Sequence, residues 1–261
     1  MTAQVPVAVR ARDVLACEWI KLRSLRSTYW TLLIAVVTPI AISALAAVAL
    51  AGPPAHHGPP PDPLEPGLLS LEYAVLSVGV LGVTVFSTEY GTGLIRTTFA
   101  AMPRRRAVLA AKAAVVAAVT LVAGEAVAFA SFGLAQAVLS GKHLGVSLSQ
   151  PGVPGAVLAN GLLLFAVAMI AVGLGAIVRD TAGGISAYVG VIFLPAIVAL
   201  LLHAPWGARV GRFTLVYAAR QVSELHPATN LFSPAWSMLV LLAWPAAVLL
   251  IAAVTITRRD A

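Results

Sequence analysis

The sequence predicts an all-α integral membrane protein with six transmembrane helices. Sixty per cent of the 261 residues are apolar and only 10% are charged, whereas soluble domains carry about 25% charged residues. About 20 apolar residues in helical form cross a bilayer. The apolar windows are rich in Ala and Leu, which favours helices that satisfy their own backbone hydrogen bonds. We predict a single transmembrane domain over residues 1–261, with spans at 29–51, 68–86, 113–139, 153–178, 183–202 and 234–256.

The distribution of basic residues predicts the orientation of the chain. Thirteen of the 17 Lys and Arg flank the predicted spans on one side, and the opposite side holds Lys142, Arg209, Arg212 and Arg220. Cytoplasmic loops of membrane proteins carry the excess of Lys and Arg, so we expect both termini in the cytoplasm. The net charge of +7 therefore reflects topology, and nucleic acid is not expected as a partner. The first span is expected to be retained, because its apolar core exceeds the 7–15 residues of a signal peptide.

Residues 1–28 are expected to contain a helix on the cytoplasmic membrane surface. Its apolar residues near one helical face are Val14, Leu15, Trp19, Leu22 and Leu25. Arg12, Lys21 and Arg23 lie mostly off this face, and we predict that Lys21 and Arg23 anchor the helix at the membrane. Glu18 interrupts the apolar face. The other interpretation is an ordinary basic flank that only orients the first span.

Two outward loops differ in character. The segment 52–67, GPPAHHGPPPDPLEPG, is rich in Pro and is predicted to be extended rather than helical. The segment 204–233 keeps apolar residues among its charges, and a structureless loop of that length is unusual. We therefore expect a short helix packed against the outer membrane face in that segment.

The loop between the second and third spans, residues 88–106, is predicted to form a short cytoplasmic helix. Gly91 and Gly93 disfavour helix and place the end of the second span near Tyr90. Thr92 is expected to cap a new helix, and Pro103 to end it after about ten residues.

This helix is predicted to be amphipathic, with apolar positions at Leu94, Ile95, Phe99 and Met102. We expect Phe99 and Leu94 to fit a hydrophobic groove on a soluble partner, with Glu89 and Arg96 as polar contacts. Anchoring at the anionic leaflet is assigned to Arg104, Arg105 and Arg106. A plain basic loop that only fixes topology is the alternative.

Several kinds of catalytic and metal site are not predicted. The sequence contains no GxxxxGK[ST] phosphate loop and no HExxH zinc motif. An intramembrane hydrolase built on Ser186 and His203 is disfavoured because these residues are predicted near opposite membrane faces. The five His residues lie in outward loops, where a zinc or copper site with Asp62, Glu65 or Glu224 is the functional alternative to scattered surface residues. One cysteine, Cys17, supports no disulfide framework.

Glu125 is the carboxylate predicted well inside a span. A charged group at the middle of a bilayer costs about 3 kcal/mol, so such groups usually face a bundle interior and often mark function. Two interpretations stay open: Glu125 lines a transport pathway or gate, or it is a neutral residue bonded to a neighbouring helix. Thr120, Gly124, Ala128 and Ser131 offer a small face beside it for helix packing.

The ordered motifs resemble the membrane (permease) subunits of bacterial type-two ABC exporters. In that family a short coupling helix follows the second span, and the positions that match it here are Glu89, Tyr90, Gly93, Arg96, Pro103, Arg106 and Lys112. The N-terminal surface helix of the family is matched by Glu18, Lys21, Leu22 and Arg23. Leu94 stands where Thr is usual, and Gly91 replaces a polar residue.

The resemblance implies a translocation pathway that is powered by another subunit. A separate ATPase subunit would bind ATP and Mg. The residues that would couple the chain to this subunit are Glu89, Tyr90, Gly93, Arg96 and Phe99. This chain would bind no cofactor or metal and carry no catalytic residue of its own. A second permease subunit, identical or related, would complete the pathway in a bacterial plasma membrane. The alternative is an ATPase-independent secondary transporter or a membrane scaffold, although the sequence shows no convincing internal repeat.

Overall fold

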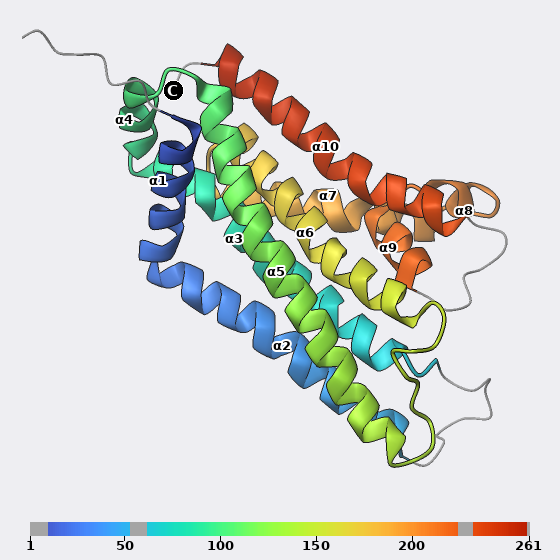
Figure 1. The fold of residues 1–261 in the computed structure, drawn as a ribbon. Coiled ribbons are helices and arrows are strands. Elements are labelled where there is room, and N and C mark those ends of the chain that lie inside the picture. Colours follow the sequence, from blue (N-terminus) through green and yellow to red (C-terminus); the bar gives the residue numbers. More distant parts are fainter. Residues whose placement is uncertain (1–9, 53–61, 224–231, 260–261) are drawn as a thin grey trace, which may run out of the picture.

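The computed structural model describes residues 10–52, 62–223 and 232–259, and these ranges contain ten helices and no strand (Figure 1). Six helices are long and apolar enough to cross a membrane: α2 (Arg26–Leu50), α3 (Glu65–Gly91), α5 (Arg105–Ser140), α6 (Val153–Val178), α7 (Thr181–Leu201) and α10 (Pro234–Arg258). The prediction of an all-helical chain with six candidate spans is therefore confirmed. These helices indicate a multi-pass membrane protein.

Four shorter helices lie between or before the candidate spans: α1 (Ala11–Ser24), α4 (Leu94–Ala101), α8 (Trp206–Gly211) and α9 (Leu215–Ser223). The outward segment 204–233 thus holds two helices where one was expected. Helix α9 packs against α6, α7 and α10, because Leu215, Ala218 and Ala219 form a buried apolar face. A helix was predicted in this segment, and the structure shows that α9 buries its apolar face against other helices of the bundle.

The start of α3 differs from the sequence prediction. The helix begins at Glu65, inside the Pro-rich segment that was expected to be extended. Asp62 Oδ1 accepts a hydrogen bond of 2.9 Å from the Leu64 backbone N–H and orders the approach to the helix. Pro66 lies in the first turn, where a missing N–H breaks no helical hydrogen bond. His56, His57, Glu224 and His226, which belong to the metal-site alternative, lie outside the described residues.

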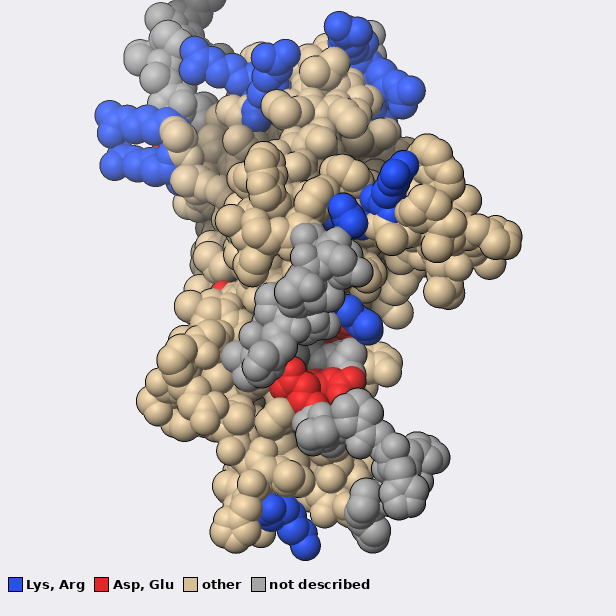
Figure 2. Space-filling model, turned by 90° about the vertical axis from the view of Figure 1, so that its right-hand side faces the viewer, with Lys and Arg blue, Asp and Glu red and all other residues tan. Residues whose placement is uncertain are grey.

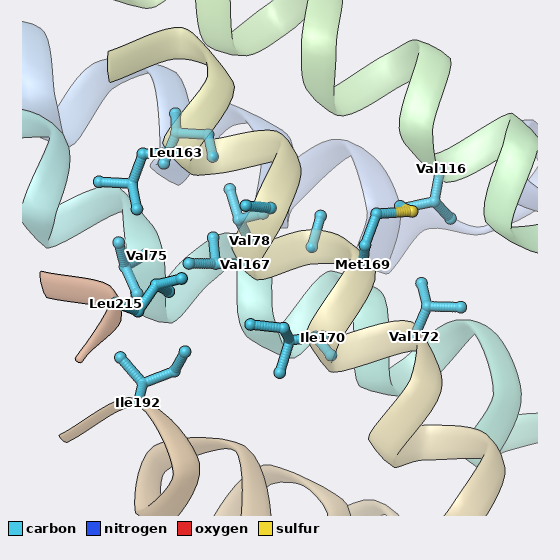
Figure 3. Packing of buried hydrophobic residues seen from close by; sticks show 14 of the residues in the cluster. Val75, Val78, Val116, Leu163, Val167, Met169, Ile170, Val172, Ile192 and Leu215 are labelled. Carbon is cyan, nitrogen blue, oxygen red and sulfur yellow. The ribbon is translucent and has the colours of Figure 1, made fainter. Parts of the chain in front are cut away.

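Helix α6 is the centre of the bundle. In its most apolar window 78% of the residues are buried, against 17% for α7 and 22% for α2. It packs against α3, α5, α7, α9 and α10. Figure 3 shows side chains of α6, such as Val167 and Ile170, packed between Val78 of α3 and Ile192 of α7. The apolar core therefore surrounds α6, and the other spans cover it.

Glycines allow α6 and α3 to approach closely. A methyl group added at Gly175 would lie 2.6 Å from the backbone oxygen of Val83. One added at Gly82 would lie 2.8 Å from the backbone oxygen of Ala168. Small residues at such positions let the backbones of two membrane helices come into contact.

One end of the bundle gathers most of the basic residues, and we call it the basic end. It holds α1, α4, the start of α5, the turn between α6 and α7, and the end of α10 (Figure 1). Figure 2 shows Lys and Arg concentrated at this upper end, with few basic groups lower down. The Arg105 guanidinium donates to the backbone oxygen of Arg259 at 2.8 Å, which joins the start of α5 to the end of α10.

Candidate functional site

Helix α1 buries the side chain of one charged residue, Glu18, in the protein. Its N-terminus is closed by a hydrogen bond of 3.0 Å from the Arg10 backbone N–H to Asp13 Oδ2. Val14, Glu18 and Leu22 are spaced by four residues and are the buried residues of the helix. Glu18 is only 4% exposed. Glu18 interrupts the apolar side of α1 in the sequence because this side of the helix faces the interior of the protein, where the carboxylate is buried.

Glu18 belongs to a buried group of four charges that we call the Lys–Glu cluster, made of Glu18, Lys21, Glu89 and Lys112. The Lys112 ammonium donates to Glu18 Oε2 at 2.6 Å and to Glu89 Oε1 at 2.5 Å. The Lys21 ammonium donates to Glu18 Oε1 and to Glu89 Oε1, each at 2.9 Å. The cluster joins α1, α3 and α5 by charge-assisted hydrogen bonds, which are stronger than neutral ones.

The cluster is balanced in charge, and three of its four members are shielded from solvent, while Lys21 is partly exposed. Two lysines face two carboxylates, and the Lys112 side chain is 1% exposed. The Lys112 ammonium also lies 5.3 Å from the centre of the Phe86 ring, which gives a cation–π contact. Removing one member of such a buried group leaves an uncompensated charge, so each member depends on the others.

Lys21 connects the cluster to α4. Its ammonium lies 3.4 Å from the Thr98 hydroxyl oxygen, in addition to the two carboxylates. Burial alone would lower the pKa of Lys21, but the hydrogen bonds to Glu18 and Glu89 and the charges of these carboxylates raise its pKa above the ordinary value. The ammonium form of Lys21 is therefore favoured, and it is this form that donates to Thr98 and to the two carboxylates.

Helix α4 follows a sharp turn at Gly93. Gly93 is the N-cap and has a φ of +74°, a left-handed conformation that favours glycine. The prediction that Thr92 caps this helix is wrong, because the Thr92 hydroxyl donates back to the Thr88 carbonyl at 2.8 Å. The helix has eight residues and ends before Pro103, since Met102 is extended as residues preceding proline usually are.

The inner face of α4 packs against the protein's own core. Ile95 is 2% exposed and Phe99 is 8% exposed, and Arg105 lies over the Phe99 ring with its guanidinium 5.3 Å from the ring centre. Phe99 and Glu89 therefore face inward in this structure, where they were predicted to face a partner. The side chains that α4 presents outward include Leu94 and Arg96.

The other predicted coupling and anchoring residues lie around the same end. Tyr90 packs under the Arg179 guanidinium at 5.0 Å from the ring centre, and Arg179 donates to the Arg259 carbonyl at 3.3 Å. Arg105 is half-buried against the end of α10. The predicted anchors with exposed side chains are Arg23, Arg104 and Arg106. Lys21 was predicted as an anchor as well, and the structure places it in the Lys–Glu cluster.

Glu125 lies apart from the cluster, where α5 crosses α6. A methyl group added at Gly161 would overlap the Glu125 carboxylate, so the carboxylate lies directly against the α6 backbone. Its Oε2 atom is buried and has no hydrogen-bond partner among the described residues. Gly124 comes close to the Gly161 carbonyl as well. Glu125 thus faces a helix contact, and both of its proposed roles stay open.

The Lys–Glu cluster itself was not predicted. The four residues were each noted in the sequence, but their meeting was not foreseen. Two signals pointed to it: Glu18 on an apolar helix face and Lys112 at the entrance of an apolar span. Among the residues that the structure describes, no group of three or more His, Cys, Asp or Glu side chains is arranged to hold a metal ion.

No protein-family model matches this chain, and no curated protein matches it in sequence.

Proposed function

We propose that this chain is the permease subunit of an ABC-type exporter in a bacterial plasma membrane. It would form half of a translocation pathway, paired with a second permease subunit of the same or a related kind. A separate subunit would bind ATP and Mg and hydrolyse the ATP. Support comes from the six candidate spans, from a sequence without a phosphate loop, and from the motif order around Glu89 and Lys112. The export direction rests on the family resemblance.

The observation that carries the proposal is the bracing of α4 by the Lys–Glu cluster. Thr98 of α4 contacts Lys21, and Lys21 is bonded to Glu18 and Glu89, which both hold Lys112. A displacement of α4 would therefore reach the cluster through the Thr98–Lys21 contact, and the cluster joins α1, α3 and α5 by buried ion pairs that are costly to break. If the ATPase makes different contacts with α4 in two of the ATPase's own states, its change of state would shift the spans between two arrangements.

The outer face of α4 is the surface proposed to dock the ATPase. Leu94 is 46% exposed, and Arg96 is exposed beside it. A groove of about 310 Å³ runs between α4 and α1, and its lining includes Leu94, Thr97 and Cys17. A helix that buries one face in its own protein and offers an apolar side chain and a cation on the other suits a groove on a soluble partner.

Leu94→Asp and Arg96→Glu are expected to weaken binding of the ATPase by about tenfold or more each, as central interface residues do. The fold should be preserved, because both side chains are exposed and an acidic residue in the first turn of α4 suits the helix dipole. The measurement is the affinity of the purified protein for the soluble phosphate-loop chain encoded beside it, together with ATP-dependent export from vesicles. Phe99→Asp is less informative, because Phe99 is buried.

Leu148→Asp is the matched control, since Leu148 is similarly exposed at 42% but lies in the loop between α5 and α6, away from the basic end. It should bind the ATPase as the wild type does. Wild-type affinity in both α4 variants would refute docking at this face. Export that follows an ion gradient and persists without any ATPase would favour a secondary transporter instead.

A further inference from the structure

A cavity opens beside the Lys–Glu cluster, and it shares Glu18, Lys21 and Leu94 with the groove between α1 and α4. It has a volume of about 400 Å³, within the range of roughly 300–1,000 Å³ that is usual for small-molecule sites. The Lys–Glu cluster forms its polar end, since all four of its residues line it. Its apolar wall comes from Leu22, Leu25, Leu81, Val85, Val115 and Val116.

The cavity has a polar end and an apolar wall, arranged as headgroups and acyl chains are in one leaflet of a bilayer. Along α3 its lining runs from Glu89 to Leu81, which is about 12 Å at 1.5 Å per residue. Glu89 lies near the end of this candidate span, and Leu81 lies deeper inside it. A molecule in the cavity would therefore hold its polar group at the basic end and lay an apolar chain between α1, α3 and α5.

The hydrogen bonds already made within the cluster decide which kind of polar group a ligand in the cavity must carry. The Lys21 ammonium has three acceptors, and the Lys112 ammonium has two carboxylates and the Phe86 ring, so neither lysine has a donor to spare. Both oxygens of Glu18 accept bonds, and so does Glu89 Oε1. Glu89 Oε2 is buried and has no donor among the described residues.

We propose that this cavity binds a membrane lipid whose headgroup is a primary ammonium. The ammonium donates to the Glu89 carboxylate, and one acyl chain covers the apolar wall. A buried carboxylate oxygen without a donor is costly, and bonds to charged groups are the strong ones. A lipid with an anionic headgroup brings a net negative charge and no cation to the Glu89 carboxylate, and a quaternary ammonium has no N–H to donate. The lipid is a structural ligand of this subunit, independent of ATP and of any exported molecule.

The test compares two lipids of the same net charge, one with N–H donors on its headgroup nitrogen and the other with three methyl groups there. Lysophosphatidylethanolamine and lysophosphatidylcholine of the same chain length are added in equal amounts to the purified protein, and the lipid that stays bound is measured by native mass spectrometry. We expect one retained lipid and a preference of about tenfold or more for lysophosphatidylethanolamine. The same lipid should raise the midpoint of thermal unfolding. Lysophosphatidylglycerol serves as the anionic arm and should be retained poorly.

Thr88→Phe supplies the variant that leaves the Lys–Glu cluster intact. Thr88 lines the cavity, its side chain is exposed, and its hydroxyl bonds only the Thr84 carbonyl of its own helix. A phenyl ring there should fill the cavity and abolish retention of the lipid. The matched control is Thr257→Phe, because Thr257 is exposed at the same end of the bundle and bonds its own helix in the same way. Glu89→Gln should remove the preference between the two lipids.

Four results would overturn the proposal. Equal retention of the two zwitterionic lipids, or stronger retention of the anionic one, would mean that Glu89 Oε2 does not select the occupant and is met by water. Retention of neither lipid would mean that the cavity is not a lipid site. Unchanged retention in Thr88→Phe would place the bound lipid elsewhere on the protein.

Discussion

Lys112→Met is expected to lower the free energy of unfolding by about 3 to 5 kcal/mol. The substitution keeps an unbranched side chain that is one atom shorter and removes its charge. Glu18 would then keep one cationic partner, and Glu89 would share the same Lys21, so two buried carboxylates would face one partly exposed ammonium. Thermal and denaturant unfolding in mild detergent measure the change.

Lys142→Met is the matched control for this loss, because Lys142 is exposed in the loop after α5, and it should change the free energy of unfolding by less than about 0.5 kcal/mol. The triple variant Glu18→Gln, Glu89→Gln, Lys112→Met should recover much of the lost stability, since it removes the three most buried charges together and leaves only the partly exposed Lys21. If Lys112→Met lowered the free energy of unfolding no more than Lys142→Met does, the cluster would not hold the basic end together.

Gly175→Ala is expected to destabilise the bundle by about 1 to 3 kcal/mol. The added methyl group would lie 2.6 Å from the Val83 carbonyl oxygen and 3.1 Å from its Cα atom. Both are backbone atoms, so relief requires that α3 and α6 move apart along the contact that forms the core. The thermal unfolding midpoint in detergent is the readout.

Gly133→Ala provides the comparison, because a methyl group at Gly133 meets nothing within 4 Å. Replacing a helical glycine with alanine in open space favours the helix by up to about 1 kcal/mol, so this variant should be as stable as the wild type or more so. Equal behaviour of the two variants would show that α3 and α6 do not pack as closely as the structure has them.

The six spans could be predicted because composition alone decides them. Apolar windows such as the one that became α6 are long enough to cross a bilayer, and helices are what such windows form. Their ends were less predictable. Thr92 was predicted to cap α4, but the N-cap is Gly93, because the turn there is left-handed and glycine adopts that conformation easily.

The direction in which an amphipathic helix faces could not be predicted from α4 alone. An apolar stripe that includes Ile95 and Phe99 has the same pattern whether it meets its own bundle or a partner. The structure buries both residues and leaves Leu94 outside. Sequence periodicity therefore indicated the helix but did not show that Phe99 would be buried in the chain's own bundle while Leu94 stayed exposed.

The Lys–Glu cluster lay beyond sequence reasoning for a physical reason. Glu18 and Lys112 are 94 residues apart, and their meeting depends on how α1 rests against α5. Charged residues in apolar surroundings predict that partners exist, but they do not say which charges pair. Glu18 was correctly seen as out of place on its helix face, and its partners became evident only from the packing of three helices.

The measurement that tests the permease proposal most directly is the labelling of Cys17 with a membrane-impermeant maleimide. Cys17 is the single cysteine of the chain, and it is exposed in the groove between α1 and α4. Ser149→Cys in a Cys17→Ser background is the control, because Ser149 is exposed in the loop between α5 and α6. We expect Cys17 to react in inside-out vesicles but not in spheroplasts. The thiol introduced in the control variant should react in spheroplasts but not in inside-out vesicles. Labelling of Cys17 should be slower when the ATPase is co-expressed. Labelling of Cys17 in spheroplasts, or a rate unaffected by the ATPase, would contradict the proposal that the basic end is the cytoplasmic docking face.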